Sequence, residues 1–84
     1  MTLGNLRNEI DKVDKELVKL LERRFELVKE IGDYKKLHNL PVLDLAREQQ
    51  VLQKKKKQLT NKDLWPHFEK LFQHIMNISK ELEK

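Results

Sequence analysis

The stretch that decides the fold is residues 6–37, LRNEIDKVDKELVKLLERRFELVKEIGDYKKL. Its apolar residues recur at alternating spacings of four and three, which is the repeat of one face of an α-helix. These residues are Leu6, Ile10, Val13, Leu17, Leu20, Leu27, Ile31 and Tyr34, and Arg24 fills the one gap in the row. The pattern predicts a single helix over about residues 4–37, with a length of ~45 Å at 1.5 Å per residue.

Such a helix is too long to be covered by the rest of the chain. The chain has 84 residues, which is the length of one domain, here residues 1–84. A chain this short buries only roughly 60–65% of its unfolded surface, and only 6% of its residues are aromatic. We therefore expect the long helix to need a partner along its length, and a second copy of the chain would supply one.

Two further helices are expected after a break at His38-Asn39-Leu40-Pro41, because Pro41 pushes the residue before it out of the α region. Asp44 is a suitable N-cap for a second helix over about residues 45–57. Asp63 is a suitable cap for a third over about residues 63–83, where Pro66 is tolerated in the first turn. No strand pattern is present, so the expected class is all-α, with one long, one short and one medium helix.

Composition excludes several classes of function. The chain has no Cys, which removes disulfides, thiolate metal sites and Cys nucleophiles. Its three His residues lack a second group of ligands, so no metal site is predicted. The net charge of +4 comes mainly from the Lys54–Lys57 run, which lacks the aromatic interleaving and extent of a nucleic-acid surface. Neither a signal peptide nor an apolar run long enough for a membrane span is visible, so we expect a cytoplasmic protein without membrane contact.

The informative residues are polar ones within the apolar rows. Arg24 and Lys35 are eleven residues apart, which places them on one helix face with ~16 Å of rise between them. Two cations on a packing face are costly unless an anion meets them. Polar residues also share a face on each of the other two helices. On the second helix these are Asp44, Arg47 and Glu48, and on the third they are Ser79 and Glu83. Such residues are often ordinary flanks of a bundle, but their presence on all three helices favours a polar site.

Arg7 adds a geometric clue. It lies seventeen residues from Arg24, or ~25 Å along a helix, so the two cannot hold one small anion within a single chain. If two long helices paired antiparallel, Arg7 of one chain would approach the region of Arg24 and Lys35 in the other. The site would then be built from two chains.

Three parts of the chain form an ordered pattern: residues 6–14, 20–24 and 31–35, then PVLDLARE at 41–48, then LFQHIMNIS at 71–79. In this order they resemble the first helix, the start of the second helix and the C-terminal helix of the all-helical, type II chorismate mutases. The resemblance implies an intertwined homodimeric helical bundle with two equivalent sites. It also implies conversion of chorismate, a dianion, to prephenate on the route to phenylalanine and tyrosine, without metal or cofactor.

The resemblance also implies roles for the cationic residues. Arg24 and Arg7 of the partner subunit would hold the two carboxylates of the substrate, with help from Arg47. Lys35 would donate to the ether oxygen, where negative charge develops as the bond breaks. Arginine suits this task because its fork binds a carboxylate through two hydrogen bonds.

Roles for the remaining polar residues follow from the same resemblance. Glu48 would accept a hydrogen bond from the ring hydroxyl, Asp44 would contact the same region, and Ser79 would lie near a carboxylate or hydroxyl. Glu83 departs from the family pattern, since many members carry Gln there as a second donor to the ether oxygen. A protonated Glu83 could still donate, so the resemblance predicts that activity falls as rising pH removes that proton.

Other functions stay open at this point. An isochorismate-pyruvate lyase would act on a similar dianion in the same kind of pocket, although Glu48 and Asp44 favour the mutase. A non-catalytic helical dimerisation or regulatory module would keep the fold without the chemistry, yet simple packing would favour Leu or Ala at several of these polar positions. A small basic bundle that binds nucleic acid would show binding that weakens steeply with salt.

Overall fold

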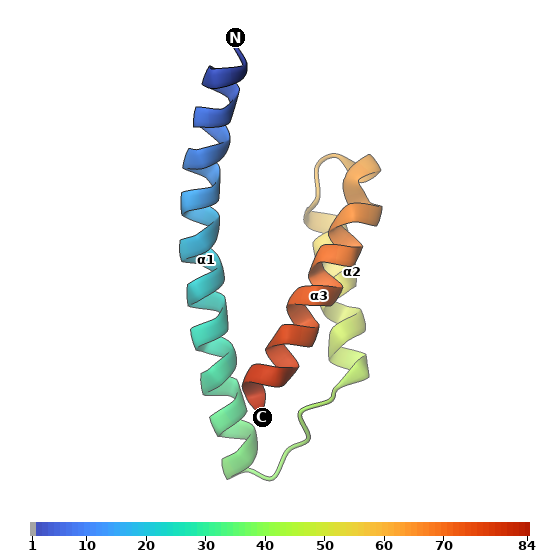
Figure 1. Ribbon diagram of the computed structural model, residues 1–84. Coiled ribbons are helices and arrows are strands. Elements are labelled where there is room, and N and C mark those ends of the chain that lie inside the picture. Colours follow the sequence, from blue (N-terminus) through green and yellow to red (C-terminus); the bar gives the residue numbers. More distant parts are fainter. Residues whose placement is uncertain (1) are drawn as a thin grey trace.

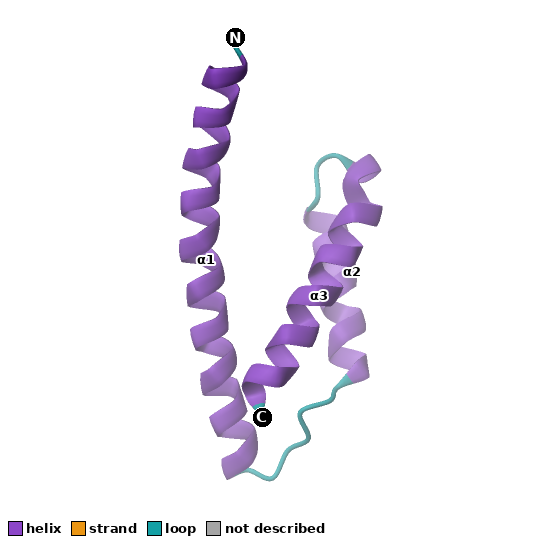
Figure 2. Ribbon diagram, viewed as in Figure 1, coloured by secondary structure: helices purple, strands orange, loops and turns teal. Residues whose placement is uncertain are grey.

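All the regular structure of the protein is helical. The computed structural model describes residues 2–84, with α1 at Leu3–Leu37, α2 at Leu45–Gln58 and α3 at Trp65–Glu83, and a 3₁₀ turn, η1, at Lys62–Leu64. These residues contain no strand (Figure 2). The all-α class and the architecture of one long, one short and one medium helix, predicted from the sequence, are confirmed.

The three helices form an open arrangement in which α1 is one arm and the α2–α3 pair is the other (Figure 1). The C-terminal half of α3 approaches the C-terminal half of α1, while α2 lies beside α3. The first half of α1 projects past the contact with α3, and the molecule measures 54 × 24 × 16 Å. The C-terminal halves of α1 and α3 therefore meet near the start of α2, and a site there draws on all three helices.

Local hydrogen bonds set both ends of α1. Thr2 accepts a hydrogen bond from the Asn5 N–H at 3.1 Å, which caps the start of the helix. At the other end, Asn39 adopts a left-handed backbone conformation with φ of 55°, and the Leu40 N–H donates to the Lys35 carbonyl at 2.8 Å. Asn tolerates this conformation better than most residues, so α1 ends before Pro41 is reached.

Side-chain capping was predicted correctly for α2 and wrongly for α3. The Asp44 carboxylate accepts from the Arg47 N–H at 2.9 Å, so Asp44 is the N-cap expected from the sequence. Asp63 does not cap α3: its own N–H donates to the Asn61 side chain at 3.1 Å, and α3 has no side-chain cap. The reason is the 3₁₀ turn, which delays the start of the α-helix to Trp65 and leaves Pro66 in its first turn.

The core is small. Val28 of α1 and Ile75 and Met76 of α3 are its buried apolar side chains. Gly32 permits the contact between the two helices, because a Cβ atom at this position would lie 2.7 Å from the backbone of Glu83. The end of α3 thus packs directly on the α1 backbone.

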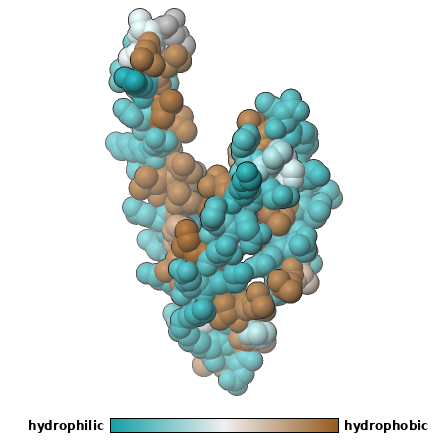
Figure 3. Space-filling model, turned by 45° about the vertical axis from the view of Figure 1, so that its right-hand side comes forward, coloured by the Kyte–Doolittle hydropathy of each residue, from teal (hydrophilic) through white to brown (hydrophobic). Residues whose placement is uncertain are grey.

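Most of the apolar face of α1 is uncovered within the single chain. Figure 3 shows apolar side chains continuing along α1 past the region that α3 covers. Five residues of its first half are between 46% and 67% exposed, namely Leu6, Ile10, Val13, Leu17 and Leu20; we call them the α1 stripe. No helix within residues 2–84 is long and apolar enough to cross a membrane.

Candidate functional site

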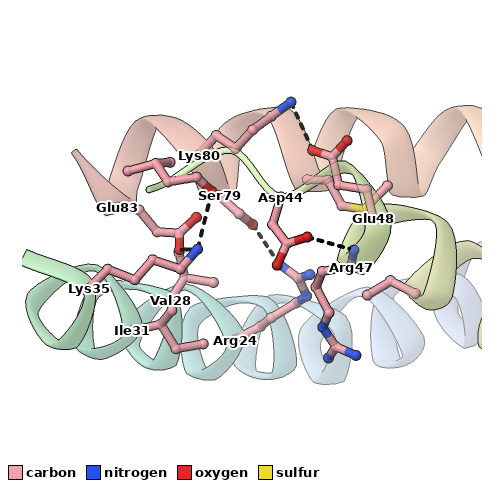
Figure 4. Close-up of a pocket in the computed structure, with 13 residues that line it drawn as sticks. Arg24, Val28, Ile31, Lys35, Asp44, Arg47, Glu48, Ser79, Lys80 and Glu83 are labelled. Atoms are coloured by element: carbon pink, nitrogen blue, oxygen red, sulfur yellow. Dashed lines mark hydrogen bonds and ion pairs between the residues drawn. The ribbon is translucent and has the colours of Figure 1, made fainter. Parts of the chain in front are cut away.

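A cavity of about 280 Å³ lies between the C-terminal half of α1, the start of α2 and the C-terminal half of α3 (Figure 4). Seven of the eight residues proposed from the sequence line it: Arg24, Lys35, Asp44, Arg47, Glu48, Ser79 and Glu83. The eighth, Arg7, is exposed on the first half of α1 and does not line this cavity. The fold thus brings together polar residues from all three helices.

Arg24 enters the cavity from α1. Its Nη1 donates to Ser79 Oγ at 2.6 Å, and that hydroxyl donates in turn to the Ile75 carbonyl at 2.7 Å. Partial burial lowers the pKa of Arg24 below its usual value by desolvation, yet a guanidinium stays charged at neutral pH. No carboxylate within residues 2–84 forms an ion pair with Arg24. A half-buried cation without a counter-ion is costly, so this site suits an anion.

Lys35 of α1 contacts both α3 and the segment that precedes α2. Its Nζ lies 2.6 Å from Glu83 Oε1 and donates to the Val42 carbonyl at 3.1 Å. Glu83 is buried, with 7% of its surface exposed. The close approach at Gly32 brings the end of α3 to α1 and so places Glu83 beside Lys35. The lysine is therefore held in place before any ligand binds.

The start of α2 supplies three more polar side chains, those of Asp44, Arg47 and Glu48, and each makes different contacts. The carboxylate of Asp44 serves as the helix cap, while the guanidinium of Arg47 extends away from it (Figure 4). The Arg47 side chain forms no ion pair within the described residues 2–84. Glu48 Oε1 is enclosed and lies 2.9 Å from Lys80 Nζ, so these two side chains form an ion pair.

Lys80 is a lining residue that reasoning from the sequence missed. Its position one helical turn before Glu83 places it on the same side of α3, but no spacing along α3 shows that it meets Glu48 of α2. With Lys80 the cavity wall carries four cations, Arg24, Lys35, Arg47 and Lys80, against the three carboxylates of Asp44, Glu48 and Glu83. Within residues 2–84 no cluster of three or more His, Asp or Glu side chains is arranged to hold a metal ion.

This arrangement can bind a small molecule that carries carboxylates. Two guanidiniums without carboxylate partners, those of Arg24 and Arg47, are free to make paired hydrogen bonds to such groups. The Glu48 carboxylate, whose Oε1 is paired with Lys80, keeps its second oxygen for a ligand hydroxyl. The Lys35 ammonium provides a fixed positive charge at the end of the cavity where Glu83 lies (Figure 4).

Comparison with known proteins gives consistent results. The solved structure of a conserved hypothetical protein from Pyrococcus furiosus superposes with a TM-score of 0.82 and 36% identity, covering 100% of this chain and 97% of that one. The T-protein of Haemophilus influenzae is 45% identical over 51 residues, which are 61% of this chain and 14% of that protein. The monofunctional chorismate mutase of Enterobacter agglomerans is 39% identical over 64 residues, which are 75% of this chain and 35% of that protein.

The chain is thus much shorter than these two named relatives, of which it covers 14% and 35%. The sequence profile described as chorismate mutase type II nevertheless matches residues 6–84, which include all eight residues that the sequence singled out. The resemblance noted in the sequence is confirmed, and the chain belongs to the chorismate mutase type II family.

Proposed function

We propose that this chain catalyses the intramolecular rearrangement of chorismate to prephenate. The observation that carries the proposal is Arg24, a half-buried guanidinium that faces the cavity without a carboxylate partner. Family membership supports the same conclusion. Chorismate carries two carboxylates, and Arg24 and Arg47 are the groups in this cavity that are free to bind them.

The proposed reaction requires few chemical groups from the protein. An intramolecular rearrangement needs neither a nucleophile nor a base, so catalysis must come from holding the folded conformer and from stabilising charge on the breaking ether bond. We assign the second task to the ammonium of Lys35, which Glu83 and the Val42 carbonyl hold in place. It accelerates the reaction only to the extent that its interaction strengthens in the transition state.

The other polar residues complete the proposed site. Glu48 accepts the ring hydroxyl through the carboxylate oxygen that Lys80 does not pair with, and Asp44 lies beside it at the start of α2. Ser79 accepts a hydrogen bond from the Arg24 guanidinium. It would therefore lie near the substrate carboxylate that Arg24 binds. Glu83 acts with Lys35 at the ether oxygen, and its protonation in the working site stays a prediction.

We further propose that the active form is an intertwined homodimer. The exposed α1 stripe supports this, because a face of this length is unusual on a stable monomer. Antiparallel pairing of two α1 helices would cover the stripe and bring Arg7 of the partner subunit to the cavity. The site would then hold two more cations than carboxylates, which matches a dianion. The cytoplasmic location expected from the sequence stays a prediction.

The test is the loss of chorismate absorbance with the purified chain, compared with buffer. We expect turnover, and a fall in kcat/KM of about 10²–10³-fold in both Arg24→Ala and Lys35→Ala. Lys29→Ala removes an exposed lysine of α1 outside the cavity and should behave as wild type. Turnover no faster than buffer would refute the enzyme and favour a non-catalytic module. Release of pyruvate from isochorismate with no prephenate from chorismate would identify the lyase instead.

A further inference from the structure

Lys80 is the one charged residue of the cavity wall to which neither the sequence nor the proposed mechanism gives a role. It lies on α3 between Ser79 and Glu83, and its ammonium is 2.9 Å from Glu48 Oε1 on α2. The side chains are 28% and 16% exposed, so this pair is more enclosed than the exposed pairs along α1, such as Lys12 and Glu9. Figure 4 shows the Lys80 side chain reaching from α3 to Glu48.

The geometry of the pair leaves Glu48 able to bind a ligand. Glu48 Oε1 is enclosed, and the Lys80 ammonium lies 2.9 Å from it. This ion pair fixes one oxygen of the carboxylate. A carboxylate accepts hydrogen bonds on two oxygens, and Glu48 lines the cavity, so its second oxygen is left for a ligand hydroxyl.

We infer that Lys80 is a positioning residue for substrate binding. It holds the Glu48 carboxylate, charged and fixed, where that group accepts the substrate hydroxyl. This inference deepens the proposed function and depends on it for the identity of the substrate. Because the hydroxyl takes no part in the bonds that form and break, its contact with Glu48 is similar in the ground state and the transition state. Such uniform binding affects KM rather than kcat.

The experiment is a double-mutant cycle between Lys80 and Glu48 in the full chain. Lys80→Met keeps the length of the side chain and removes the charge, and Glu48→Gln removes the charge that Lys80 faces. We expect Lys80→Met to raise KM about tenfold, as for a lost interaction with a charged group, with kcat within about threefold of wild type. In the Glu48→Gln background the same change should alter KM less than about twofold, since its partner is gone.

Two controls separate positioning from general charge or folding effects. Lys80→Arg keeps the charge and should restore KM to within about threefold of wild type. Lys70→Met removes an exposed lysine of the same helix outside the cavity and should leave both constants unchanged. Lys80→Gln replaces Lys80→Met if the methionine variant melts at a lower temperature than wild type.

Two results would overturn the inference: an unchanged KM in Lys80→Met, or an equal rise in KM with and without the Glu48 carboxylate. If the wild-type chain does not turn over chorismate, the proposed function fails. The inference is then decided by calorimetric dissociation constants for a stable cyclic hydroxy-dicarboxylate in the same four proteins. Coupling between the two positions supports the inference, while additive effects or absent binding refute it.

Discussion

Gly32 lets the end of α3 lie close to α1, and this close approach places Glu83 beside Lys35. A Cβ at this position would lie 2.7 Å from both the Cα and the carbonyl oxygen of Glu83. Because the obstacle is backbone, Gly32→Ala must move the end of α3 away from α1. We expect a loss of about 1–3 kcal/mol in the free energy of unfolding and a lower kcat, as Lys35 loses its contact with Glu83.

Urea denaturation and chorismate turnover of Gly32→Ala measure the two effects. Gly4→Ala is the matched control, since the nearest atom to its added Cβ is a Thr2 hydroxyl at 3.9 Å and Ala suits a helix better than Gly. It should leave turnover unchanged and not reduce stability. Equal behaviour of the two variants would show that the close approach does not position Glu83.

Arg24 gives a prediction about pH. Burial disfavours the charged form and lowers the pKa of Arg24, but the starting value of a guanidinium is so high that it stays charged in the working range. An amine at the same place starts lower, and the same desolvation lowers its pKa further. In Arg24→Lys the positive charge is therefore present below that lowered value and lost as pH rises through it.

We expect Arg24→Lys to lose about 10–100-fold in kcat/KM at pH 7, because the two-pronged contact with a carboxylate is gone. Its activity should fall further between about pH 8 and pH 10 relative to wild type, measured as the pH profile of kcat/KM for both proteins. Any decline that comes from groups other than residue 24 is common to the two proteins and cancels in the ratio of their kcat/KM values. A ratio that is constant across this range would contradict the assignment of Arg24 as a desolvated cation.

At the scale of the element, α2 depends on a residue that also belongs to the cavity. The Asp44 carboxylate accepts the Arg47 N–H at 2.9 Å and lines the site. Asn caps helices about as well as Asp, whereas Ala does not. We expect Asp44→Ala to reduce the free energy of unfolding by about 1 kcal/mol and Asp44→Asn to change it by only a few tenths.

Turnover separates the two roles of Asp44. If its charge matters for the substrate, Asp44→Asn lowers kcat/KM while its thermal midpoint stays near that of wild type. If only the cap matters, Asp44→Asn is as active as wild type and Asp44→Ala alone is impaired. Measuring both quantities on both variants therefore assigns the residue.

The helices themselves were largely predictable, because their signals are local. The 4/3 spacing of apolar residues predicted α1, and the Asp44 cap depends only on residues three apart in the chain. The 3₁₀ turn before α3 was missed, since Asn61 and Asp63 are both acceptable caps and only their backbone geometry separates them. Lys80 was missed for a different reason. Its role depends on Glu48 of another helix, and no spacing along α3 reports that distance.

At the scale of the whole molecule, the single chain leaves both its apolar face and its predicted site incomplete. The α1 stripe is exposed, and Arg7 lies on the same half of α1, away from the cavity. A substitution such as Leu17→Glu would place a charge in the proposed interface, which is costly without a partner. We expect a dimer for wild type by light scattering and a monomer without activity for Leu17→Glu.

Lys15→Glu is the control for Leu17→Glu, because it makes a larger change in charge at an exposed position of α1 that is not in the stripe. It should remain dimeric. A wild-type chain that is monomeric and active would exclude the shared site, and Arg7 would then have no part in catalysis.

Mixing two inactive variants tests the shared site directly. Arg7→Ala and Arg24→Ala each disable both sites of their own homodimer if every site takes Arg24 from one chain and Arg7 from the other. In a mixed dimer the two lesions fall in the same site, and the second site keeps both arginines. After unfolding and refolding at equal amounts, random pairing of a symmetric dimer should restore about a quarter of wild-type activity. No recovery in a mixture that light scattering shows to be dimeric would contradict the shared site, and an active Arg7→Ala homodimer would exclude Arg7 from both sites.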